Sequence, residues 1–158
     1  MKTSFLWIED GAIADLKYLL APILVSGDYD PIIALDVSEG IRRLREREFE
    51  AVIVDIRIPP GDDSNWISLY NQRGKNKARA RLGLQLLTCL LSTEPCDIVI
   101  TDIPTWVCAN RFGVLTVEGK DEVSASLESL GINVYDQKTA STPKTVLEDL
   151  VRRIRSNQ

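Results

Sequence analysis

A short apolar run, Ala51 to Val54, constrains the fold of this chain more than any other feature of the sequence. The run is rich in β-branched residues and ends just ahead of a Pro-Pro-Gly sequence at 59–61. Such a run is typical of a buried strand in a parallel sheet. Asp55 follows it directly, and ligands bind at the carboxyl ends of the strands in open parallel sheets. Asp55 is therefore a candidate nucleophile or cation ligand, or else it caps the turn before Pro59.

Other short apolar runs alternate with segments of helical periodicity along the chain. Strands are expected at 3–8, 32–35, 51–54, 97–103, 112–117 and 132–135. Helices are expected at 12–20, from Ser38 as an N-cap, at 83–91, at 120–130, and from Thr142-Pro143 onward. Pro22 and Gly27 are expected to bound a connection. This alternation indicates βαβ units and predicts an α/β fold, a parallel sheet with helices on both faces.

The composition excludes several classes of function. The 158 residues include no histidine, which rules out Ser-His and Cys-His catalysis and the commonest zinc ligand. The net charge of −4 argues against general nucleic-acid binding. Cys89, Cys96 and Cys108 match no metal motif, and we expect reduced cytoplasmic thiols, two of them buried. We expect neither an export signal nor a membrane span, since no apolar run approaches the roughly 18 residues required.

The segment 73–81 carries five basic residues and no acid, on a chain that is acidic as a whole. The segment 61–82 around it shows no sustained periodicity. One interpretation, which we prefer, is a flexible and solvated loop. The other is a docking surface for an acidic partner or a phosphate-bearing ligand.

Reactive side chains follow several of the expected strands. Glu9 and Asp10 follow the first strand, Asp55 follows the central one, Thr116 lies in a later one, and Lys138 follows the last. Because the carboxyl ends of parallel strands share one edge, these groups could meet there. Three carboxylates repel one another unless a cation is bound, and Mg²⁺ prefers oxygen ligands. Lys138 and Thr116 could then hold the oxygens of a phosphoryl group transferred to Asp55.

In this order and spacing, the residues resemble the receiver domain of two-component response regulators. The resemblance covers most of the chain. It rests on the acidic pair Glu9-Asp10, Asp55 with Pro59 four residues on, the helix start Gly83 to Leu87, Thr116 in LTVEG, and the ending Gly131, Tyr135 and Lys138. In this family, a hydroxyl-bearing switch residue senses the phosphoryl oxygens, and Thr116 matches its position. Thr101 is a second candidate for that residue, but Thr116 lies at the usual spacing before Lys138.

The resemblance implies a flavodoxin-like, doubly wound five-stranded parallel sheet in one domain, 1–158, with insertions at about 61–82 and 97–111. The second insertion could add a strand or hairpin. It also implies Mg²⁺ held by Glu9, Asp10, Asp55 and the backbone carbonyl of Arg57. Asp55 would be the phosphoacceptor, and Thr116 and Tyr135 would form the switch.

The implied partners are a histidine kinase or phosphotransfer protein and a downstream protein, and the implied location is the cytoplasm. The resemblance is also compatible with a homodimer. No direct contact with nucleic acid or membrane is implied. The domain would catalyse at most its own phosphorylation and dephosphorylation.

Three departures from the family pattern favour an alternative. Thr139 stands where a proline normally follows the lysine, and Val117 stands where Ala or Gly normally follows the switch hydroxyl. The loop between Pro60 and Gly83 is also longer than usual. The alternative is a pseudo-receiver that is never phosphorylated and works as a protein- or ligand-binding module.

Overall fold

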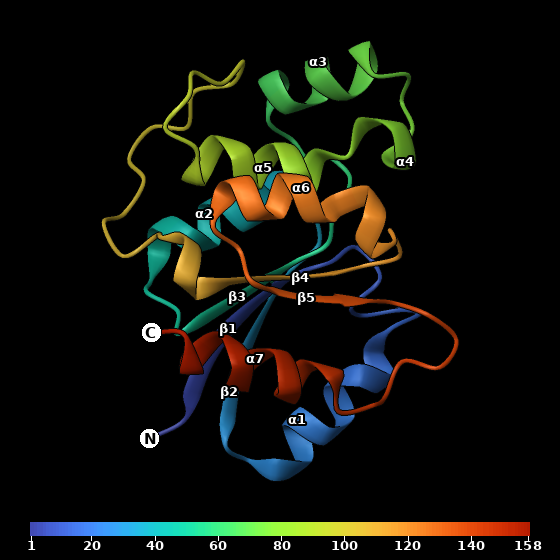
Figure 1. Cartoon of the computed structure of the whole chain (residues 1–158), viewed down its shortest axis with the longest axis vertical. Coiled ribbons are helices and arrows are strands. Elements are labelled where there is room, and N and C mark those ends of the chain that lie inside the picture. Colours follow the sequence, from blue (N-terminus) through green and yellow to red (C-terminus); the bar gives the residue numbers. More distant parts are fainter.

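A computed structural model describes residues 1–158, and its centre is a sheet of five parallel strands in the order β2-β1-β3-β4-β5 (Figure 1). The strands are β1 (Thr3–Ile8), β2 (Tyr29–Ala34), β3 (Ala51–Val54), β4 (Phe112–Thr116) and β5 (Val134–Gln137). Every neighbouring pair is parallel. The predicted α/β architecture with a five-stranded, flavodoxin-like sheet is therefore confirmed.

Helices cover both faces of this sheet. They are η1 (Lys17–Leu20), α1 (Ala21–Ser26), α2 (Val37–Glu46), α3 (Ser64–Gln72), α4 (Lys77–Ala80), α5 (Leu82–Leu91), η2 (Ala109–Arg111), α6 (Lys120–Leu130) and α7 (Val146–Ser156). In Figure 1, α1 and α7 lie on one side of the sheet, and α2, α3, α5 and α6 lie on the other. No helix has both the length and the apolar character needed to cross a bilayer.

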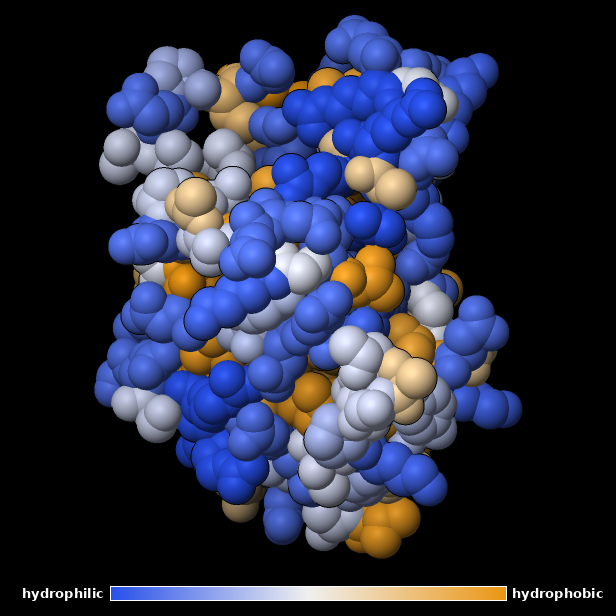
Figure 2. All heavy atoms as spheres, turned by 45° about the vertical axis from the view of Figure 1, so that its right-hand side comes forward, coloured by the Kyte–Doolittle hydropathy of each residue, from blue (hydrophilic) through white to orange (hydrophobic).

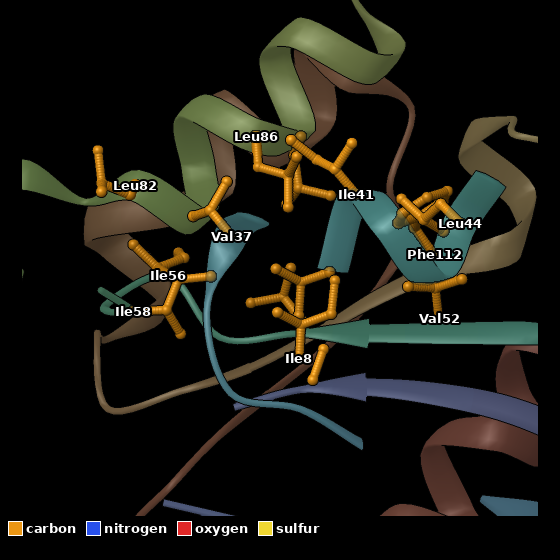
Figure 3. Packing of buried hydrophobic residues seen from close by; sticks show 14 of the residues in the cluster. Ile8, Val37, Ile41, Leu44, Val52, Ile56, Ile58, Leu82, Leu86 and Phe112 are labelled. Atoms are coloured by element: carbon orange, nitrogen blue, oxygen red, sulfur yellow. The ribbon is translucent and has the colours of Figure 1, made fainter. Parts of the chain in front are cut away.

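Each face of the sheet builds its own hydrophobic core. On β1, Leu6 and Ile8 join the cluster under α2, α5 and α6, whereas Phe5 and Trp7 join the cluster under α1 and α7. Figure 3 shows Ile8 and Val52 of the sheet facing the helical side chains of the first cluster. Because side chains alternate between two buried faces, the central strands carry unbroken apolar runs.

The first helical segment begins later than the sequence predicts. Residues 10–16 form turns, and the helix expected at 12–20 is replaced by η1 and α1. Pro22 lies in the first turn of α1, and Gly27 ends the helix with φ of 73°. Proline fits the first helical turn because no intrahelical partner is needed for its missing N–H. Pro22 and Gly27 therefore bound a helix and not a connection.

Two other helix starts also differ from the prediction. Asp36, not Ser38, is the N-cap of α2, and its side chain accepts a 2.8 Å hydrogen bond from the N–H of Glu39. The Ser38 hydroxyl instead donates to the carbonyl of Pro60 at 2.6 Å, which ties α2 to the turn after β3. The last helix, α7, begins at Val146, beyond Pro143.

The 61–82 insertion is folded, so the flexible-loop interpretation is wrong. It contains α3 and α4, and Asp63 caps α3 by accepting from the N–H groups of Asn65 and Trp66. Trp66 and Leu69 pack into the core beside α5. Only these two apolar positions of α3 are buried, which is too few to give the sequence a clear helical period.

Residues 97–103 form no strand, contrary to the prediction. Ile98 alone in this run is buried, while Val99 is 80% exposed. Cys89 and Cys96 form a disulfide with Cα atoms 5.6 Å apart, so the expectation of three reduced thiols is also wrong. These two residues are half-buried, and Cys108 is free and exposed. A close pairing of this kind depends on how the chain returns after α5, which the spacing alone does not indicate.

Candidate functional site

Three carboxylates meet where β1 and β3 end. The two strands are aligned so that Ile8 pairs with Val54, and the N–H of Asp55 donates to the carbonyl of Ile8 at 3.0 Å. Glu9 and Asp55 therefore follow the same point of two adjacent strands, and Asp10 follows Glu9. Each of the three offers an oxygen, and these oxygens lie within 4.8 Å of one another.

Lys138 reaches this cluster from the end of β5. Its N–H donates to the carbonyl of Thr116 at 2.7 Å, which continues the pairing of β4 with β5. From there the side chain extends past the end of β4. Its Nζ forms an ion pair with Glu9 and lies 3.1 Å from Oδ2 of Asp55. The structure thus brings together Glu9, Asp10, Asp55 and Lys138, four groups that the sequence predicts for one site.

The electrostatics of the cluster show a surplus of negative charge in a buried place. Burial and the neighbouring charge of Asp55 raise the pKa of Glu9 to about 8. Burial alone would lower the pKa of Lys138, but Asp55 and Glu9 together raise it above its ordinary value. Crowded carboxylates of this kind are suited to a divalent cation with oxygen ligands. The residues present therefore fit Mg²⁺.

Asp10 has an ion-pair partner that the sequence does not predict. Lys77 of α4 forms an ion pair with Oδ2 of Asp10. Partial burial acts to raise the pKa of Asp10, but the hydrogen bonds from Lys77 and with Glu9 outweigh it, so this pKa lies below the ordinary value. Lys77 and Asp10 are 67 residues apart in the sequence, and nothing in the periodicity of 61–82 indicates the contact.

A cavity of about 710 Å³ opens over the cluster. Besides the three carboxylates and Lys138, it is lined by Gly11, Asp15, Leu16, Arg57, Val117, residues 76–78 of the 61–82 insertion and residues 139–140. The N–H of Arg57 donates to Oδ1 of Asp55 at 3.4 Å, so the segment after β3 stays close to the acid. Small molecules could therefore reach Asp55 through this opening.

The expected switch residues, Thr116 and Tyr135, are not among the residues that line this cavity. Thr116 is fully buried, and its hydroxyl oxygen accepts from the N–H of Glu118 at 3.5 Å. The Tyr135 hydroxyl donates to the carbonyl of Glu118 at 2.5 Å. Thr101 is exposed, and its carbonyl accepts a hydrogen bond from Arg45 in the last turn of α2. That turn lies where the strands begin, at the opposite end of the sheet from Asp55. Thr101 is thus too far from Asp55 to contact a phosphoryl group there.

Sequence reasoning missed the part played by Glu118. Its carboxylate is buried and accepts from Nε of Arg57 at 3.1 Å and from Nη2 of Arg81 at 2.6 Å. These two ion pairs join the segment after β3, the start of α5 and the segment after β4. The residue types alone could not reveal them, because Arg81 is one of five basic residues in the segment 73–81 and Glu118 one of many acids.

Comparisons with known proteins find likeness at the level of the fold. A response regulator receiver domain protein (CheY-like) from Methanospirillum hungatei has 18% identity and a TM-score of 0.61, with 99% of this chain and 97% of that chain covered. The receiver domain of a sensor histidine kinase from Pseudomonas aeruginosa, with magnesium coordinated in its active-site cleft, has 14% identity and a TM-score of 0.56, and 99% of each chain is covered.

A third similar structure is a response regulator from Burkholderia pseudomallei with a phosphorylated aspartic acid, calcium and citrate. It has 19% identity and a TM-score of 0.57 over 98% of this chain and 72% of that chain. No protein-family model matches the chain, and no curated protein matches it either. The sheet order, the flanking helices and these near full-length structural matches together establish that this chain has the fold of a CheY-like response regulator receiver domain.

Proposed function

We propose that this chain is a phosphoacceptor receiver domain, in which Asp55 accepts a phosphoryl group from a histidine kinase or a phosphotransfer protein. The observation that carries the proposal is the convergence of Glu9, Asp10 and Asp55 within 4.8 Å, with Lys138 Nζ 3.1 Å from Asp55. The similar structures with a phosphorylated aspartate and with bound magnesium support the same chemistry.

In the proposed reaction, an oxygen of Asp55 forms a bond to the phosphorus of the donor's phosphohistidine. The bond from phosphorus to the imidazole nitrogen breaks, and its electron pair stays on that nitrogen. Lys138 would hold an oxygen of the transferred group by a charge-assisted hydrogen bond. Glu9, Asp10, Asp55 and the carbonyl of Arg57 would hold Mg²⁺. When bound, the ion would neutralise the negative charge that develops on the phosphoryl group during transfer.

Thr116 and Tyr135 would convert this local chemistry into a change of surface. Both bind the backbone of Glu118, one at its N–H and the other at its carbonyl. If the Thr116 hydroxyl turned to a phosphoryl oxygen, it would leave the N–H of Glu118, and the backbone that holds Tyr135 would move with it. The face around β5 would then favour one state of a downstream protein or of a second copy of the chain.

As proposed, residues 1–158 act as one receiver unit with Mg²⁺ as its cofactor. The domain works in the cytoplasm through protein partners and without contact with nucleic acid or membrane. It turns over no substrate beyond its own aspartyl phosphate. The insertions at 61–82 and 97–111 then modify a receiver and do not add a separate activity.

One observation favours the alternative, a pseudo-receiver that binds partners without being phosphorylated. Val117 lines the cavity and is 45% exposed, whereas Thr116 is fully buried and does not line it. The extra methyl groups of Val117 would crowd a phosphoryl group on Asp55.

Intact-mass measurement after incubation with acetyl phosphate and millimolar Mg²⁺ separates the two functions. The receiver gains the mass of one phosphoryl group, and Asp55→Asn removes the gain. Asp62→Asn, an exposed carboxylate on the same loop, serves as the matched control and should be phosphorylated as the parent is. A folded protein that gains no mass would support the pseudo-receiver.

A further inference from the structure

The 61–82 insertion contributes a second amine to the acidic cluster. Lys138 binds Glu9 and Asp55, and Lys77 of α4 binds Asp10, so each carboxylate of the cluster has an amine partner. In Figure 1, α4 lies on the side of the molecule where the loop between β5 and α7 leaves the sheet. Residues 76–78 form one wall of the cavity and residues 138–140 form another. The carboxylate cluster is therefore contacted by the amine of Lys77 on one wall of the cavity and by that of Lys138 on the other.

The position of α4 is fixed from its base. Nη1 of Arg73 donates to the carbonyl of Ala80 at 2.7 Å, and its Nη2 donates to Oε1 of Gln85 on α5 at 2.7 Å. Ala80 is fully buried, and the next residue, Arg81, binds the buried Glu118. Lys77 therefore extends to Asp10 from a backbone that is anchored to the domain, and its contact is a product of the fold.

Lys77 is held on a carboxylate that the proposed function requires for Mg²⁺. A cation that approaches the cluster meets the positive Nζ of Lys77 on the same carboxylate. The side chain of Lys77 is 46% exposed and that of Asp10 is 26% exposed, so water can replace either partner when they separate. Lys138 is different, because its side chain is only 12% exposed and contacts two acids. Of the two amines, Lys77 is the one that can leave.

We propose that Lys77 is an exchangeable internal counter-ion, which occupies Asp10 in the ion-free protein and is displaced when Mg²⁺ binds. The 61–82 insertion then sets the metal affinity of the site, and through it the level of Mg²⁺ at which Asp55 can be phosphorylated. This inference rests on the proposed function, because it needs Asp10 to be a metal ligand.

Calorimetric titration of the ion-free protein with MgCl₂ tests the exchange. Lys77→Gln should bind Mg²⁺ about three- to tenfold more tightly than the parent, which corresponds to the loss of one partly exposed ion pair and its competing charge. Arg79→Gln removes the same charge from the same helix without removing an ion pair, and its affinity should stay within about twofold of the parent. Lys77→Arg keeps the counter-ion and should keep the parent affinity.

A second readout follows the amine itself. An acetylating reagent should modify Lys77 faster when Mg²⁺ is present, because the displaced Nζ is free, and peptide mass spectrometry gives the rate at that residue. Lys75, an exposed lysine of the same insertion without an ion pair, should react at the same rate with and without Mg²⁺.

The outcomes separate this inference from the proposed function. If Lys77→Gln and Arg79→Gln tighten Mg²⁺ binding equally, or if Lys77→Gln weakens it, the counter-ion role is wrong and the metal site stands. If neither the parent nor Lys77→Gln binds Mg²⁺ at millimolar concentrations, both the counter-ion role and the proposed metal-dependent function are overturned.

Discussion

Nη2 of Arg81 donates a 2.6 Å hydrogen bond to the carboxylate of Glu118, which is 2% exposed. Arg81 directly precedes α5 and has a φ of 48°, a conformation that is uncommon for a residue other than glycine. Arg57 binds the same carboxylate from the segment after β3. The loops that surround Asp55 and Thr116 are therefore joined through one buried acid.

The substitution Glu118→Gln should destabilise the fold. The variant removes the charge that two arginines share, and a buried ion pair that loses one partner leaves the other uncompensated. Because both arginines are about one-third exposed, we expect a loss of about 1–3 kcal/mol in the free energy of unfolding. Urea denaturation measures it. Glu128→Gln, an exposed acid on α6, should change the free energy by less than about 0.5 kcal/mol. Equal effects of the two substitutions would show that the ion pairs of Glu118 do not stabilise the fold.

Gly83→Ala tests the packing of α5 against the segment that carries Asp55. A Cβ at position 83 would lie 1.9 Å from the carbonyl oxygen of Asp55 and 2.8 Å from Cα of Ile56. Both are backbone atoms that cannot turn away, so we expect a loss of about 3 kcal/mol in stability, measured by urea denaturation. Gly40→Ala is the control, since its Cβ meets the flexible end of Ile8 and should cost less. A Gly83→Ala protein as stable as the parent would show that α5 packs differently.

The pH dependence of stability should reveal Glu9. Its pKa is about 8 in the folded protein against an ordinary 4.5, because burial and the charge of Asp55 favour the protonated form. A raised pKa contributes stability that is complete below pH 4.5 and is lost as the pH rises through about 8. The ion-free protein should therefore melt at a higher temperature at pH 6 than at pH 9.

The chain has no histidine, so few other groups titrate in this window. Thermal melts in the presence of a chelator measure the effect, and Glu9→Gln, which cannot ionise, should flatten the dependence. A parent melting temperature that is the same at pH 6 and pH 9 would be at odds with a buried, proton-binding Glu9.

How far the sequence predicts this molecule depends on how local each interaction is. The sequence predicts β1, β3 and α6 with the bounds they have, because their apolar patterns are set by residues close in sequence. The meeting of Glu9 and Asp55 also follows from a general property, since the ends of adjacent parallel strands lie together.

The features that the sequence does not predict depend on contacts between segments that are far apart along the chain. Lys77 meets Asp10 across 67 residues, and Arg81 meets Glu118 across 37. Only Trp66 and Leu69 of α3 are buried, so the sequence of this helix shows no clear period. The helix is stabilised by the tertiary packing of these two side chains. Val99 belongs to an apolar run that looks like a strand, but the run pairs with no strand of the sheet, and Val99 is 80% exposed.

The disulfide between Cys89 and Cys96 should stabilise the fold independently of the proposed phosphorylation site. Cys89 and Cys96 close a short loop at the end of α5, whereas Gly83 at its start faces Asp55. Cys96→Ser should lower the free energy of unfolding by about 2 kcal/mol, because a loop of this length limits the unfolded chain. Urea denaturation measures it, with Cys108→Ser, which removes a free thiol, as the control. If the two variants are equally stable, the bond does not contribute as described.

The proposed function depends above all on the phosphorylation of Asp55. An aspartyl phosphate is an acyl phosphate, and borohydride reduces it to a homoserine residue, which peptide mass spectrometry can place in the sequence. After incubation with acetyl phosphate and Mg²⁺, we expect this conversion at position 55. It should be weakened by Lys138→Ala and absent when a chelator removes the metal. Conversion at another carboxylate, or none at 55 in folded protein with Mg²⁺ present, would contradict the proposed function.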